Sequence, residues 1–337
     1  MQERAFNMIY SGAVPWADIE PHFRKALELH DEVLGTNDLA TLRLIYSFGL
    51  GLSFNFQLKE GALLVEDGPK RSRSVLRQDH PQIPGLMTLL GHIYSYLNTL
   101  EEAEELLLPS LKLRRKILGP ENSLTILART YVQQGKFVEA EELTEELKSL
   151  CRRVKIENGL FTQWNVSVLG WCYLEQGYIA EAGTVCELAV QAAERKPDGN
   201  PLANANTFIN LGAVRLAQEQ YADAEKRLRQ GLPFVEKYWA KEAYRPYVMS
   251  LLGASLSGQK RYADAEPLLR QGYEGLVQRQ ASLPPYLNAP RRITESLARL
   301  VQRYDAWGKP AQAAEWKQKL AAFQQANHAA EKKGVQP

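Results

Sequence analysis

Small residues recur along this chain in pairs twelve positions apart, and the pairs repeat about every 42 residues. One copy joins Gly91 to Ala103, with Tyr94 three positions after the glycine. Two later copies, Tyr221–Gly231 and Tyr262–Gly272, are nearly identical. A period of this length is typical of a chain built from one structural unit stacked many times, in which each unit contacts only its neighbours.

The spacing within a copy predicts two antiparallel helices in each unit. We number the first small residue position 8, on the first helix, and its counterpart position 20, on the second helix. Small side chains at both positions let the two backbones approach to the short end of the usual range of about 8–10 Å. Short turns such as Gly135-Lys136 and Gln176-Gly177 are expected to join the two helices. Position 8 is occupied by Asn7, Gly49, Gly91, Ala128, Gly170, Gly212, Gly253 and Val301, and position 20 by Ile19, Gly61, Ala103, Ala140, Ala182, Ala224, Ala265 and Ala313.

The repeat predicts an all-α chain with about eight helix pairs in a single array over residues 1–325. Little sequence precedes Phe6, so the first repeat is expected to be truncated and the chain to begin inside a longer protein. The Ala-rich stretch that begins at Ala313 is expected to form a last helix that covers the final apolar face, as terminal repeats require. Residues 326–337 are predicted to be a disordered tail.

Composition and charge argue against two classes of partner. The net charge of +2 gives no reason to expect a nucleic acid, and the basic clusters fall near predicted helix ends, where cations are favourable. The most apolar run, residues 42–56, is interrupted by polar side chains and is too short to cross a membrane. Three cysteines cannot form a disulfide framework, and no signal peptide is recognisable, so a cytoplasmic location is expected.

Groups that catalyse reactions are not brought together by any motif in the sequence. No His-Glu-x-x-His pair, phosphate-binding loop or kinase signature occurs. Cys172 and Cys186 fall at positions 10 and 24 of one repeat, where small apolar residues pack, and a zinc site requires about four ligands. We therefore expect no enzyme activity, no cofactor and no metal.

The segments Lys116–Asn122, Gly135–Glu141 and Arg261–Arg270 carry a pattern that resembles the tetratricopeptide repeat, and within that family the longer kinesin-light-chain type. The resemblance covers roughly residues 5–322. It implies a right-handed superhelical α-solenoid whose concave face is lined by the first helices. The ending Tyr304–Trp316 is similar to the closing repeat of arrays that often follow a serine/threonine kinase domain in bacteria.

The resemblance also indicates which side chains face the concave groove. In this family they stand at positions 2, 5, 6, 9, 12 and 13, and aromatic, Asn and Arg side chains there suit an extended peptide or a helix. Packing between repeats remains the alternative role for the aromatic residues. Kinesin light chains carry Asn at position 6 of several repeats, whereas only Asn210 does so here, which favours a more apolar ligand. The candidate groove residues are Tyr46, Phe54, His92, Tyr96, Arg129, Trp164, Trp171, Asn206, Asn210 and Arg299.

These observations predict a non-catalytic scaffold that binds a protein or peptide partner in the concave groove. The alternative is a sensory or substrate-recruiting region of a bacterial serine/threonine kinase whose catalytic domain lies outside this chain. Self-association also stays open, because the groove can be filled by the protein's own tail or by a second copy, and the array can serve as an oligomerisation module.

Overall fold

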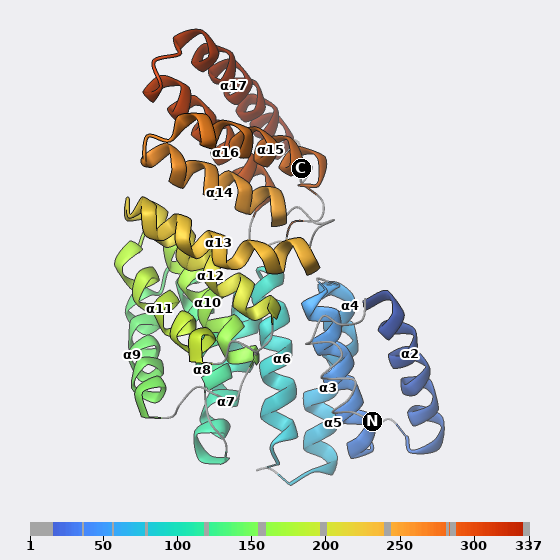
Figure 1. Ribbon diagram of the computed structural model, residues 1–337. Coiled ribbons are helices and arrows are strands. Elements are labelled where there is room, and N and C mark those ends of the chain that lie inside the picture. The colour runs from blue at the N-terminus through green and yellow to red at the C-terminus, as the bar shows by residue number, and fades with distance from the viewer. Residues whose placement is uncertain are drawn as a thin grey trace. The chain divides into compact units, whose positions relative to one another are not determined.

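Helices make up the regular structure of this chain throughout its described residues, which form no strand. The computed structural model describes residues 16–35, 37–55, 57–77, 80–117, 121–153, 160–195, 201–238, 244–280, 283 and 288–332 (Figure 1). The helices are α2 (Trp16–Val33), α3 (Leu39–Phe54), α4 (Leu58–Val65), α5 (Gly68–Val75), α6 (Gln82–Leu97), α7 (Leu100–Ile117), α8 (Glu121–Gln134), α9 (Phe137–Arg153), α10 (Leu160–Glu175), α11 (Ile179–Arg195), α12 (Pro201–Ala217), α13 (Tyr221–Tyr238), α14 (Tyr244–Gly258), α15 (Tyr262–Gln278), α16 (Ala289–Ala306) and α17 (Pro310–Lys332). The all-α helical-repeat solenoid expected from the sequence is confirmed.

The chain forms two compact units, residues 1–203 and 204–337, where the sequence predicted one array. Within the first unit the helix pairs α6–α7, α8–α9 and α10–α11 each pack together, and within the second unit α14–α15 and α16–α17 do so. Helix α12 begins at the boundary. The predicted position 8 of the first repeat, Asn7, lies outside the described residues.

Close crossings between paired helices lie where the small residues predict them. A Cβ atom built on Gly91 of α6 would lie 2.7 Å from Cγ of Leu107 and 3.3 Å from the carbonyl oxygen of Ala103, both on α7. The equivalent atom on Gly212 would lie 2.7 Å from Cγ of Leu228 and 3.4 Å from the carbonyl oxygen of Ala224. Position 8 therefore packs against positions 20 and 24 of the next helix, which confirms the predicted register.

The turns between paired helices share one left-handed residue. Gly135 (φ 76°) and Gly177 (φ 84°) adopt this conformation at the turns that the sequence marked. Asn98 (φ 64°), Glu219 (φ 59°) and Lys260 (φ 63°) adopt it at the turns after α6, α12 and α14. An L side chain is disfavoured there, so these three positions store strain that glycine would remove.

Two elements differ from the simple repeat pattern. The second helix of the repeat that begins with α3 is divided into α4 and α5, and the division precedes Gly68-Pro69, where proline suits the first turn of a new helix. Helix α17 continues to Lys332, so the predicted boundary at residue 325 falls inside it. Its last turns are rich in Ala, Gln, Glu and Lys, which favour helix, and no glycine occurs between Gly308 and Gly334.

Candidate functional site on the first helices

Five of the ten candidate groove residues lie together in the first unit. They come from four different first helices: Phe54 ends α3, His92 and Tyr96 lie on α6, Arg129 on α8 and Trp164 on α10. We call these five residues the aromatic–arginine cluster. Its members span 110 residues of sequence, from Phe54 to Trp164, and repeats that are not neighbours in the chain therefore meet there.

Aromatic contacts join the outer members of the cluster. The rings of Phe54 and Trp164 lie edge to face with their centroids 5.9 Å apart. The indole Nε1 of Trp164 donates a long hydrogen bond of 3.4 Å to the hydroxyl of Tyr96. Edge-to-face pairs of this kind stabilise beyond the area that they bury. The aromatic candidates thus pack against one another, which is the alternative role that the sequence left open for them.

Arg129 lies at the centre of the cluster and is almost completely buried, with 1% of its surface exposed. Its guanidinium carbon lies 4.3 Å from the centroid of the Tyr96 ring. Its Nε donates to the hydroxyl of Ser95 over 3.2 Å, and its Nη2 lies 3.3 Å from Nδ1 of His92. A guanidinium only donates hydrogen bonds, so Nδ1 of His92 must accept, which requires the neutral imidazole.

Burial controls the protonation of the ionisable groups around Arg129. It holds the pKa of His92 well below the ordinary histidine value, and the neighbouring charge of Arg129 acts in the same direction. Burial also raises the pKa of the Cys172 thiol to about 12, in spite of the opposing effect of Arg129. The thiol is therefore protonated at neutral pH, which gives it little nucleophilic or metal-binding character.

Two further candidates of the first unit occupy different surroundings. Tyr46 on α3 is half-buried beside Arg114 and Gly85, and burial raises the pKa of its hydroxyl. Trp171 on α10 is 1% exposed. A ligand could touch Tyr46 directly, whereas Trp171 contributes mainly to the packing of the unit.

In the second unit, the candidates belong to hydrogen-bond networks on α12, α14 and α16. Asn206 is fully buried and accepts a hydrogen bond of 2.6 Å from the hydroxyl of Tyr244. Asn210, one helical turn further along α12, is also fully buried. Arg299 donates to the hydroxyl of Ser250 over 3.1 Å and lies 3.3 Å from a carboxylate oxygen of Glu295.

Several residues of these networks were not among the candidates, although they occupy the same repeat positions. Ser95 and Gln133, at positions 12 and 13, are joined by a hydrogen bond of 2.8 Å. Ser250 and Glu295, at positions 5 and 2, bind Arg299. The repeat register would have identified all four, but their serine, glutamine and glutamate side chains gave no separate signal.

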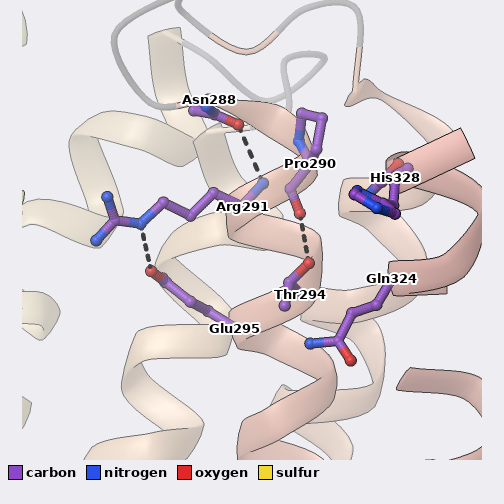
Figure 2. A pocket seen from close by; sticks show the side chains of 8 residues that line it. Asn288, Pro290, Arg291, Thr294, Glu295, Gln324 and His328 are labelled. Atoms are coloured by element: carbon purple, nitrogen blue, oxygen red, sulfur yellow. Dashed lines mark hydrogen bonds and ion pairs between the residues drawn. The ribbon is translucent and has the colours of Figure 1, made fainter. Parts of the chain in front are cut away.

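A cleft of about 480 Å³ lies between the start of α16 and the end of α17, and none of the ten candidates lines it. Figure 2 shows bonds within the start of α16: the Asn288 side chain accepts from the backbone N–H of Arg291, and Arg291 pairs with Glu295. Helix capping and a pair of charges one turn apart account for these bonds.

Among the described residues, no three His, Cys, Asp or Glu side chains are grouped so that they could hold a metal ion. The same residues include no helix that is long and apolar enough to cross a membrane.

Comparison with known proteins agrees with the helix-pair architecture. Family models of the tetratricopeptide repeat match residues 85–123 and 123–146, which together cover most of α6, all of α7 and α8, and part of α9. Residues 85–146 of the chain thus carry the tetratricopeptide-repeat pattern. The matched segments contain the Gly91–Leu107 crossing, so the family pattern and the observed packing coincide.

One curated relative and several solved structures match the chain at low sequence identity. The chain is 25% identical over 167 residues to outer dynein arm-docking complex subunit 4 of Bos taurus; the match covers 47% of this chain and spans only 23% of the length of that relative.

Among solved structures, the APC/C hetero-tetramer Cut9–Hcn1 is 14% identical, with a TM-score of 0.59 over 88% of this chain and 48% of that one. The quorum sensor NprR of B. thuringiensis is 14% identical, with a TM-score of 0.56 over 92% and 82%. A putative kinesin light chain of Podosopora anserina is 17% identical, with a TM-score of 0.39 over 70% and 95%. The likeness to Cut9–Hcn1 and NprR supports the fold.

Proposed function

We propose that this chain is a non-catalytic scaffold that binds a protein or peptide partner along the face formed by its first helices. The observation that supports this most is the convergence of groups from α3, α6, α8 and α10 into one aromatic–arginine cluster. Aromatic and arginine side chains are the types that dominate binding energy at protein interfaces. The cluster itself is largely buried, so the half-buried candidates Tyr46 and Arg299 are the side chains of the first helices that a partner can reach.

A selection from a displayed library of random twelve-residue peptides tests the proposal, with the full chain as bait. Half-buried groove residues suit the test because they can touch a ligand without forming the core. Tyr46→Ala and Arg299→Ala are expected to weaken the binding of at least some selected peptides tenfold or more, measured by fluorescence anisotropy. Lys226→Ala, on the exposed side of α13, serves as the control. Unchanged affinities in both groove variants would contradict the proposal.

A second candidate function is a sensory or substrate-recruiting region of a bacterial serine/threonine kinase. The similarity of Tyr304–Trp316 to the closing repeat of kinase-linked arrays favours it. The gene that encodes this chain provides the test: a kinase domain in the same reading frame supports this function, and an unrelated neighbouring sequence argues against it. For both candidates we propose a cytoplasmic setting, since neither requires a membrane or an oxidising compartment.

A further inference from the structure

Four charged residues lie on one exposed side of α7. Their spacing along the sequence places them on the same side of the helix. The opposite side of α7 carries Ala103, Leu107 and Leu111, which are buried in the first unit. The four exposed residues, which we call the α7 charge stripe, are Glu101, Glu105, Lys112 and Lys116.

No ion pair among the described residues involves the α7 charge stripe, whereas other charges of the same helix are paired within the chain. Glu104 pairs with Lys136 at 2.6 Å, and Arg115 pairs with Glu146. These two ion pairs join α7 to the repeat that follows it. The charges of the stripe are therefore available to another molecule.

The order of the charges along the stripe is unfavourable within a single molecule. Glu101 and Glu105 are one helical turn apart, and like charges at this spacing repel each other. The same holds for Lys112 and Lys116. The helix dipole favours the outer two residues, but its effect falls off within the first and last turns. Glu105 and Lys112 lie further inside α7, so the dipole does not account for them.

The same order of charges is complementary to a reversed copy of itself. The outer residues, Glu101 and Lys116, are centred on the same point of the helix as the inner residues, between positions 108 and 109. If two α7 helices lie antiparallel about a two-fold axis at that point, Glu101 of each copy faces Lys116 of the other. Glu105 then faces Lys112 in the same way. Such reciprocal contacts are the property of a two-fold symmetric interface.

We propose that the α7 charge stripe is the contact surface of a two-fold dimer, in which the partner is a second copy of this chain with its α7 antiparallel. Half-buried Leu108 and Pro109 lie at the centre of the stripe, and an apolar centre with a charged rim is typical of protein interfaces. The contact is centred on one helix of each copy, so the dimer is weak and sensitive to salt. Because a second helix carries this surface, the inference is independent of the binding proposed for the first helices.

Sedimentation equilibrium of the full chain tests the dimer. We expect association of the wild-type protein at concentrations up to about 0.5 mM, which detects small and transient interfaces. Its affinity should fall tenfold or more when the salt concentration rises from about 50 mM to about 500 mM. A wild-type protein that stays monomeric at low salt, or a dimer that salt does not weaken, would overturn the proposal.

Charge reversal tests whether the stripe is the contact surface. Glu105→Lys and Lys112→Glu each place like charges opposite one another twice in the dimer, so each variant alone should lose affinity tenfold or more. An equimolar mixture of the two variants restores every facing pair and should associate about as strongly as the wild-type protein.

Lys226→Glu on the exposed side of α13 is the control, because it makes the same change in net charge as Lys112→Glu. It should keep the wild-type affinity. A mixture that stays monomeric, or a reversal variant that dimerises alone with wild-type affinity, would show that α7 is not the interface.

Discussion

Small side chains at positions 8 and 20 determine how closely the two helices of each repeat approach. Position 20 is fully buried at Ala103, Ala140, Ala182, Ala224 and Ala265. At Ala103, Ala182 and Ala224 the crossing is tight, because a Cβ built on the facing glycine would lie 3.3–3.4 Å from the carbonyl oxygen of the alanine. Adding a methyl or a larger group at such a crossing therefore overpacks it and lowers the stability of the fold.

Ala224→Leu tests this packing. The three added carbon atoms must enter the crossing of α12 and α13, so we expect the free energy of unfolding to fall by about 1–3 kcal/mol in urea titrations. Ala222→Leu makes the same chemical change at an exposed position of α13 and should be nearly neutral. Equal stabilities for the two variants would mean that the helices do not cross at residue 224.

Glu219→Gly tests the strain at the turn after α12. The residue is exposed and has φ of 59°, so glycine removes the Cβ clash and loses few contacts. We expect a gain of about 1 kcal/mol in the free energy of unfolding. Gly177→Ala introduces the opposite change at φ 84°, where nothing lies within 4 Å of the new Cβ, and should destabilise by a similar amount. A loss of stability in Glu219→Gly would contradict the strain.

At the scale of single elements, the first helices differ from the second helices in what they bury. Helices α6, α8 and α10 bury polar and charged groups such as His92, Arg129 and Asn165 together with their apolar residues. Helix α7 buries mainly apolar and small side chains on one face. Buried polar groups require specific partners, so they fix which first helices can lie beside one another.

The neutral His92 makes stability depend on pH. Burial and Arg129 lower its pKa in the folded state below the unfolded value near 6.5. The unfolded state therefore binds a proton first as the pH falls, and stability is lost below about pH 6.5, by at most about 1.4 kcal/mol per pH unit. Above that pH the group contributes no pH dependence.

Urea unfolding at pH 7.5 and pH 5.5 measures the effect. The loss of stability between the two values should be smaller in His92→Gln, which cannot be protonated. Burial raises the pKa of the nearby Tyr96 hydroxyl and raises the pKa of the Cys172 thiol to about 12, so neither group titrates between pH 5.5 and pH 7.5. An identical pH dependence in wild type and variant would show that His92 is not the responsible group.

At the scale of the whole molecule, stability is distributed along a stack of repeats. Each repeat packs mainly on its neighbours, so a local defect is expected to spread only a short distance. The contacts between residues are concentrated within residues 1–203 and within residues 204–337.

Ala265→Leu, which overpacks the crossing of α14 and α15, tests this expectation. Hydrogen exchange measured by mass spectrometry should show faster exchange in α14 and α15 and little change in α6 and α7. Equal acceleration in all four helices would show instead that the chain opens as one cooperative body.

The sequence alone determined the helix pairs, their register and most of their turns. These depend on interactions within about 40 residues: Gly91 against Leu107, or the left-handed conformation of Gly135 and Gly177, follow from spacing and from glycine's missing side chain. The sequence also contains Gly68-Pro69, the signal for the division between α4 and α5, although one continuous second helix was expected in that repeat.

The tertiary structure decided which of the candidate residues meet. Phe54 and Trp164 are 110 residues apart, and their contact depends on how the small rotation of each repeat accumulates over several repeats. It also decided that Arg129 is buried without a carboxylate partner among the described residues. The repeat position of a side chain can be counted along the chain. Its solvent exposure, however, depends on which side chains from distant repeats pack against it, and no local sequence pattern predicts those contacts.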